Sequence, residues 1–154
     1  MLDPMTTDLL LAIAHHLLIF VLFAILLIEA LLIRPGMQAP FIRRMTYLDR
    51  LYGATAVLVL AVGSSRVLFG AKGALFYLGN PLFWAKIVSF AAVAVLSIGP
   101  TLKLIEWSRN GRADPLFTPP AEDMRKVRRF IAGELAVFPL ILIFAAAMAR
   151  GFGL

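Results

Sequence analysis

The chain has 154 residues, of which 61% are hydrophobic and 16% are charged, and it contains no cysteine. Soluble globular chains are about 45–50% apolar and about 25% charged, so this composition excludes an ordinary soluble domain. The lack of cysteine excludes disulfides, iron–sulfur clusters and haem held by thiolates, and a cysteine nucleophile. The formal net charge of +6 alone would suit nucleic-acid binding, but the distribution of the basic residues favours membrane topology.

Four apolar stretches predict membrane-spanning helices, at about residues 8–33, 51–70, 82–105 and 130–149. Each is close to the roughly 20 residues that a helix needs to cross a bilayer. Because backbone polar groups in lipid must be satisfied within their own segment, helices are the expected structure. We therefore predict an all-α fold, an integral membrane four-helix bundle that forms a single transmembrane domain over residues 1–154.

Lysine and arginine counts predict how these helices are oriented. The loop over 34–50 carries four arginines and the loop after the third stretch carries six basic residues, whereas the tail before the first stretch carries none. The positive-inside rule then places both basic loops in the cytoplasm and both termini on the periplasmic side of a bacterial inner membrane, with Lys72 and Arg150 as isolated outer cations. Asp3 and Asp8 stand where a cleavable signal peptide would be basic, so none is expected. The basic residues of the two loops are Arg34, Arg43, Arg44, Arg50, Arg109, Arg112, Arg125, Lys126, Arg128 and Arg129.

The basic loops contain no interleaved aromatic platform of the kind that binds single-stranded nucleic acid. We therefore expect them to contact the anionic lipids of the bilayer, and we expect no nucleic-acid partner.

Ionisable side chains at membrane depth are costly, so they usually face the bundle interior or a wet cavity and are candidates for function. From the helical rise of 1.5 Å per residue, an outer layer contains Arg66, Lys86 and one of two histidines. An inner layer contains Glu29, Glu134 and the loop residues Asp49 and Arg50. The six candidates are His15, His16, Glu29, Arg66, Lys86 and Glu134.

The two histidines are consecutive, so their side chains diverge by about 100° and cannot both point at one site. A buried neutral imidazole in a four-helix bundle can ligate haem iron, and Lys86 can reach the same layer as a second ligand or as a cation for a propionate. The alternative for a lone membrane histidine is an interhelical hydrogen bond. The pair alone does not predict zinc or copper, which requires ligands spaced by three or four residues or drawn from several helices.

Two further groupings have both a functional and a structural interpretation. Arg66 lies beside an aromatic segment over 76–84 that includes Tyr77, which can seat an anionic amphipathic ligand or form an interfacial aromatic belt. Glu29 and Glu134 can form ion pairs with Arg50 or other loop arginines, or provide a proton path from the cytoplasmic face.

A set of short motifs extends over essentially the whole chain and is specific in combination. It resembles an uncharacterised bacterial family of predicted four-helix membrane proteins, a resemblance that implies no activity. The motifs are Ala14-His15-His16-Leu17 with Glu29, Asp49 to Tyr52-Gly53, Arg66-Val67, Lys72-Gly73, Phe76-Tyr77, Asn80-Pro81, Phe83-Trp84-Ala85-Lys86, Ser97-Ile98 with Pro100-Thr101, Trp107, and Met148 to Gly153.

A more distant similarity is to the layout of HemJ-type protoporphyrinogen oxidases and, more loosely, of CopD-like membrane proteins. It rests on the early histidine, on Trp84-Ala85-Lys86 and on Arg128-Arg129-Phe130 followed by Glu134 and Pro139.

In the HemJ group a histidine of the first helix and a lysine of the third form the functional pair, and haem b is bound. The histidine corresponds to His16 by the Leu17-Leu18 that follows it, with His15 as the fallback, and the lysine corresponds to Lys86.

We therefore predict a haem b-binding inner-membrane protein that acts as an oxidoreductase or electron carrier, with a quinone or a porphyrin as partner. His16 is the expected axial ligand, Lys86 a second ligand or propionate partner, and Arg66 and Tyr77 seat the ring edge. The alternative is a non-redox transporter or assembly subunit that binds an anionic amphipathic ligand. A third hypothesis is a structural bundle, in which small residues such as Gly53 and others of the second stretch form a homo-oligomer face.

Overall fold

The computed structural model describes residues 3–70 and 73–153, so Lys72 lies outside the described residues. The described part of the chain is helical and contains no strand, which confirms the all-α prediction. Its four long helices are each long and apolar enough to cross a membrane. The helices are α1 (Pro4–Leu32), α2 (Ala39–Phe69), the short α3 (Ala74–Leu78), α4 (Pro81–Ala113) and α5 (Ala121–Ala149).

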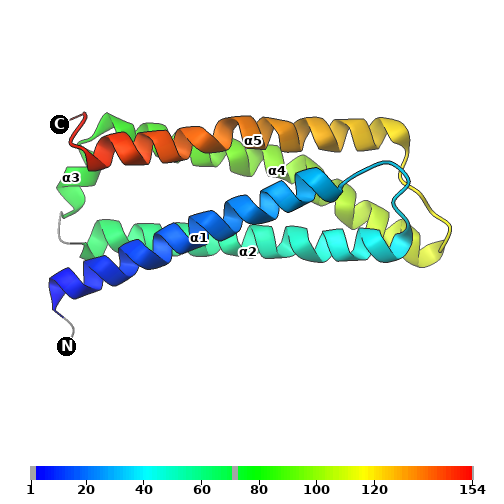
Figure 1. Cartoon of the computed structure of the whole chain (residues 1–154), viewed down its shortest axis with the longest axis horizontal. Coiled ribbons are helices and arrows are strands. Elements are labelled where there is room, and N and C mark those ends of the chain that lie inside the picture. The colour runs from blue at the N-terminus through cyan, green and yellow to red at the C-terminus, as the bar shows by residue number, and fades with distance from the viewer. Residues whose placement is uncertain (1–2, 71–72, 154) are drawn as a thin grey trace.

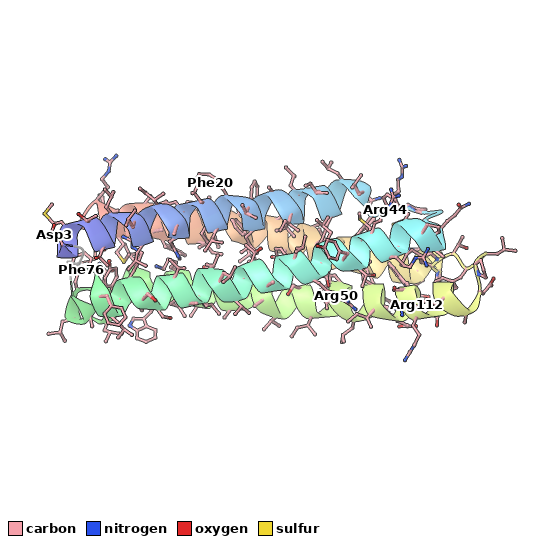
Figure 2. All side chains as sticks on the ribbon, turned by 90° about the horizontal axis from the view of Figure 1, so that it is seen from below. Asp3, Phe20, Arg44, Arg50, Phe76 and Arg112 are labelled. Atoms are coloured by element: carbon pink, nitrogen blue, oxygen red, sulfur yellow. The ribbon has the colours of Figure 1, made fainter. Side chains whose placement is uncertain are left out.

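The long helices form a bundle in which both chain termini lie at one end (Figure 1). Helix α1 packs against α2 and α5, α2 also packs against α4, and α4 packs along α5. We call the end that holds both termini and α3 the terminal end. The opposite end, where the connections over residues 33–38 and 114–120 lie, is the basic end. Figure 2 shows Arg44 and Arg112 at the basic end and Asp3 and Phe76 at the terminal end.

The helices extend well beyond the apolar stretches at the basic end. The segment over 34–50, expected as a loop, is instead mostly helical, because α2 begins at Ala39 and carries Arg43, Arg44 and Arg50. Hydropathy identifies only the part of a helix that is apolar enough to lie within the hydrocarbon of the bilayer. The polar residues that extend the helix beyond this part stay helical because one face of the helix is buried against its neighbours. In α2 that face includes Ile42 and Met45. Helix α3 is also absent from the prediction.

The core runs along the axis of the bundle, where large side chains such as Leu22, Leu26, Trp107 and Phe138 are almost fully buried. Many other large apolar side chains face outward on all four long helices. Among them Phe20 is 65% exposed and Val88 is 67% exposed. Such a continuous apolar surface is unusual on a soluble monomer, whereas it suits contact with lipid.

Candidate functional site

Two adjoining cavities lie in the bundle near the terminal end, with volumes of about 90 and 150 Å³. We call them the terminal-end cavities. Four residues line both of them: His15, Gly63, Val67 and Lys86. The smaller cavity has mainly apolar walls, to which Phe83 and others contribute. All five residues predicted to hold a cofactor line the larger one, namely His15, His16, Arg66, Tyr77 and Lys86.

The imidazole of His15 is enclosed between α1 and α2. A glycine makes this possible, because a Cβ atom at Gly63 would lie only 3.1 Å from Cε1 of the ring. The Nδ1 atom of His15 is buried and makes no hydrogen bond of standard geometry among the described residues, although the ring interacts with the backbone of Val59. The same ring lines both cavities.

His16 is more exposed than His15 and lines only the larger cavity. Its Nδ1 lies 2.6 Å from the carbonyl oxygen of Ala12, to which it donates a hydrogen bond. The two rings meet edge to face with their centroids 6.4 Å apart and both line the larger cavity, so the prediction that consecutive histidines cannot share one site is wrong. Of the two histidines, His15 is the one enclosed by the bundle.

Two cations and a buried tyrosine complete the larger cavity. The Nζ atom of Lys86 lies 5.1 Å from the ring centroid of Phe83, a cation–π distance. Arg66 Nε lies 4.0 Å from Asp8 Oδ1, at the outer limit of an ion pair, and neither atom has a hydrogen-bond partner among the described residues. Tyr77 is buried on α3 and packs against Phe83. Asp8 is not among the residues predicted for this site, since one carboxylate near a helix start gives no signal of its own.

A second group of polar side chains lies in the interior, toward the basic end. We call it the polar layer, and each of the four long helices contributes to it. Tyr52 OH donates a hydrogen bond of 3.0 Å to Glu134 Oε2, and Thr101 Oγ1 donates one of 2.8 Å to Asp49 Oδ1. Oε1 of Glu29 is buried and has no hydrogen-bond partner among the described residues. The members are Glu29 on α1, Asp49 and Tyr52 on α2, Thr101 on α4 and Glu134 on α5.

The expected ion pairs of Glu29 and Glu134 with arginines are not observed within residues 3–70 and 73–153. Arg50 follows Asp49 directly in α2, so the two side chains leave the helix in different directions. Arg50 is exposed and, with Arg109 and Arg112, lines a surface hollow of about 220 Å³ at the basic end. At Glu134 the uncharged hydroxyl group of Tyr52 therefore takes the place that was predicted for a cation.

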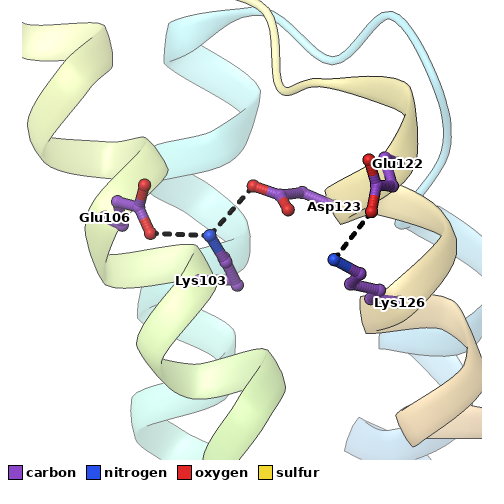
Figure 3. Close-up of polar contacts among 5 residues, drawn as sticks. All are labelled: Lys103, Glu106, Glu122, Asp123 and Lys126. Atoms are coloured by element: carbon purple, nitrogen blue, oxygen red, sulfur yellow. Dashed lines mark hydrogen bonds and ion pairs between the residues drawn. The ribbon is translucent and has the colours of Figure 1, made fainter.

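The ion pairs at the basic end lie near the surface, and that of Lys103 with Asp123 joins α4 to α5. Lys103 Nζ lies 3.0 Å from Glu106 Oε2 on its own helix and 2.9 Å from Asp123 Oδ2 on α5 (Figure 3). Lys126 and Glu122 form a further pair within α5. These contacts fix the relative position of the two helices where they leave the apolar region.

The fold and the apolar surface define a helical membrane protein with four membrane-length helices. The chain belongs to the family described as "Predicted membrane protein (DUF2214)", whose model matches residues 7–153. The chain matches no curated protein and no solved structure. The comparisons therefore confirm the resemblance to an uncharacterised membrane-protein family and lend no support to similarity with HemJ-type or CopD-like proteins.

Proposed function

We propose that this protein binds haem b in the terminal-end cavities and acts as an oxidoreductase or electron carrier. The observation that carries the proposal is that four side chains selected for their cost inside a membrane line one cavity together with Tyr77. They supply an imidazole for iron, cations for propionates and a buried phenol. When bound, the haem would supply the redox chemistry, and the chain would hold and orient it.

In this proposal His15 would hold the haem iron in preference to His16, because its ring lines both cavities and is the more enclosed of the two. Lys86 is the second ligand or a propionate partner, and Arg66 binds a propionate. A membrane quinone or a porphyrin is the matching redox partner.

The size of the cavities adds a requirement to the proposal. At about 90 and 150 Å³ they are smaller than the roughly 300–1,000 Å³ of sites for drug-sized ligands. A planar ring therefore needs the helices to separate. Helix α1 packs against α2 and α5, and within the described residues it does not pack against α4. Separation of these diagonal helices to admit a ring would require α1 or α4 to shift against α2 and α5, with which both pack.

The test is the absorption spectrum of the purified protein, oxidised and reduced with dithionite, with a pyridine haemochrome assay. We expect a Soret band, reducible α and β bands and about one haem per chain. His15→Ala should abolish the band, whereas His16→Ala is the matched control and should retain it. A protein that stays colourless when a haem precursor is supplied during expression would exclude the proposal.

A second candidate function is the binding of an anionic amphipathic ligand by a non-redox transporter or assembly subunit. It is favoured by Lys86, which forms no ion pair within the described residues, and by Arg66, whose distance from Asp8 is 4.0 Å. A colourless protein that binds a fluorescent fatty acid would support it. Arg66→Gln and Lys86→Gln should then weaken binding, whereas His15→Ala should leave it unchanged.

We also propose that the basic end faces the cytoplasm of a bacterial inner membrane and the terminal end faces the periplasm. The support is the gathering of arginines at the basic end, where Figure 2 labels Arg44 and Arg112.

A further inference from the structure

The proposed haem site leaves the polar layer without a role. Glu29 lies 14 residues after His15 on α1, which corresponds to about 21 Å along the helix. The polar layer is therefore a separate site, and its role does not depend on the proposed function. We propose that the polar layer is a proton-binding site, in which Glu29 holds the proton in the interior of the bundle.

The three carboxyl groups of the polar layer are almost fully buried. The exposed fraction is 2% for Glu29, 4% for Asp49 and 1% for Glu134. Glu29 interacts electrostatically with both of the others. Three ionised carboxylates in this position would repel each other where the surroundings screen charge poorly, and each would have lost its hydration.

No cation compensates these carboxyl groups within the part of the chain that the structure describes. The titratable groups that face Glu29 are Asp49 and Tyr52 on α2 and Glu134 on α5. Helix α4 contributes the hydroxyl group of Thr101. Arg50 acts on Asp49 electrostatically but is exposed. A buried acid without a cation usually becomes neutral by binding a proton.

The hydrogen bonds indicate which carboxyl group holds the proton. Glu134 accepts a hydrogen bond from Tyr52, and Asp49 accepts one from Thr101, so each of these two has a donor that stabilises its ionised form. Glu29 Oε1 has no donor within the described residues and is buried. A proton on Glu29 removes its charge and supplies a donor beside the carboxylate oxygens of Asp49 and Glu134, which can only accept.

The arrangement suits a proton better than a metal ion. Within residues 3–70 and 73–153, no three His, Asp or Glu side chains lie close enough together to bind one metal ion. One oxygen atom each of Asp49 and Glu134 is already occupied by a hydroxyl donor. Glu29 is also three residues from Leu32, where α1 ends, so a proton travels only about 5 Å along the helix to reach the connection at the basic end.

Infrared spectroscopy of the full-length purified protein in detergent tests the proposal directly, because a protonated carboxyl group has a C=O band that a carboxylate lacks. We expect this band at neutral pH, with a shift in D₂O, and its loss at high pH. Glu29→Gln should remove the band. Glu122→Gln is the matched control, because it removes an exposed glutamate from a surface ion pair and should leave the band unchanged. A wild-type spectrum without the band at neutral pH would overturn the proposal.

Thermal unfolding against pH provides the second measurement. A glutamate in the unfolded chain has lost its proton near neutral pH, so the folded state binds one proton more than the unfolded state. The folding equilibrium of the wild type should therefore weaken by about tenfold per pH unit as the pH rises. Glu29→Gln should remove that slope. If Glu29→Gln fails to fold, Glu29→Asp keeps the carboxyl group and should shift the band.

The measurements are repeated in sodium chloride, in potassium chloride and in the chloride of a large organic cation. A slope that is the same in all three salts supports proton binding. A melting temperature that rises with sodium or potassium in the wild type but not in Glu29→Gln would identify a metal-cation site and overturn the proposal. Both experiments work on protein without haem, so their outcome is independent of the cofactor assignment.

Discussion

At the scale of single residues, Gly63 determines whether the terminal-end cavities exist. The nearest atoms to a Cβ at this position are those of the His15 ring, at 3.1 and 3.5 Å. Gly63→Leu should displace the imidazole and fill part of both cavities, and we expect haem content to fall at least tenfold in a haemochrome assay. Gly53→Leu on the same helix is the control, because nothing lies within 4 Å of a Cβ there. Full haem content in Gly63→Leu would contradict the assignment of these cavities.

The hydrogen bond between Tyr52 and Glu134 leads to a prediction about stability. Tyr52→Phe leaves a buried carboxylate oxygen without its donor, and we expect a loss of about 1–2 kcal/mol in the free energy of unfolding. The measurement is equilibrium unfolding in mixed detergent micelles. Tyr47→Phe on the same helix is the control, because Tyr47 is 64% exposed, and it should change the free energy little. Equal effects of the two substitutions would show that the buried bond contributes nothing.

The difference between the two polar groups explains what sequence reasoning can find. Each charged or imidazole side chain inside an apolar stretch is conspicuous by itself, without knowledge of its neighbours in space. The charged and imidazole side chains of the larger cavity could therefore be predicted. Tyr52 and Thr101 are not conspicuous in the sequence, because placing a hydroxyl group on a membrane helix costs little free energy. Each becomes a hydrogen-bond partner of a carboxyl group only when the packed helices bring the two side chains together. The prediction that Glu134 pairs with an arginine was wrong, because it rested on charge alone. In the folded bundle α2 places Tyr52 opposite Glu134.

At the scale of elements, Asn80 joins the start of α4 to the end of the chain. Its side chain is fully buried, accepts a hydrogen bond from Leu82 N at 2.8 Å and donates one to the Phe152 carbonyl at 3.0 Å. Asn80→Ala removes both contacts, and we expect a cost of about 0.5–2 kcal/mol in the free energy of unfolding.

Asn80→Asp separates the two roles of this side chain, because a carboxylate keeps the acceptor and loses the donor. We expect Asn80→Asp to retain most of the stability and to increase amide hydrogen exchange around Phe152. Asn110→Ala, at a half-buried position of the same helix, is the control and should leave both readouts unchanged. Unchanged exchange in Asn80→Asp would show that the contact with Phe152 does not hold the C-terminal segment.

Helix lengths show where hydropathy stops being informative. The apolar stretches predicted all four long helices, because about 20 apolar residues have few alternatives to a membrane helix. Their polar ends could not be predicted in the same way. The segment that begins α5 carries Glu122, Asp123 and several basic residues, yet it is helical because Met124 and Val127 pack into the core.

At the scale of the whole molecule, the bundle predicts which positions share a side of the membrane. The chain has no cysteine, so single cysteines can be introduced without removing any. Asp3→Cys and Phe152→Cys lie at the terminal end and Leu116→Cys lies in the α4–α5 connection, all at exposed positions. On intact cells, a membrane-impermeant maleimide should label the first two and not the third.

Lysed cells are the control for this experiment, because all three cysteines should then react. Labelling of Leu116→Cys alone on intact cells would reverse the proposed orientation but keep the fold. Labelling of Asp3→Cys without Phe152→Cys would contradict the fold, since Figure 1 places both termini at one end.

The polar layer also has a consequence for biogenesis. Both of its hydrogen bonds connect the helical hairpin of α1 and α2 to that of α4 and α5, across separations of 52 and 82 residues in the chain. At a synthesis rate of about 5–20 residues per second, Tyr52 is made roughly 4–16 s before Glu134. Asp49 and Tyr52 lack their partners until the second hairpin is made, whereas Glu29 Oε1 has no hydrogen-bond partner among the described residues even in the folded bundle. We therefore expect the first hairpin to need shelter from lipid until the second hairpin arrives.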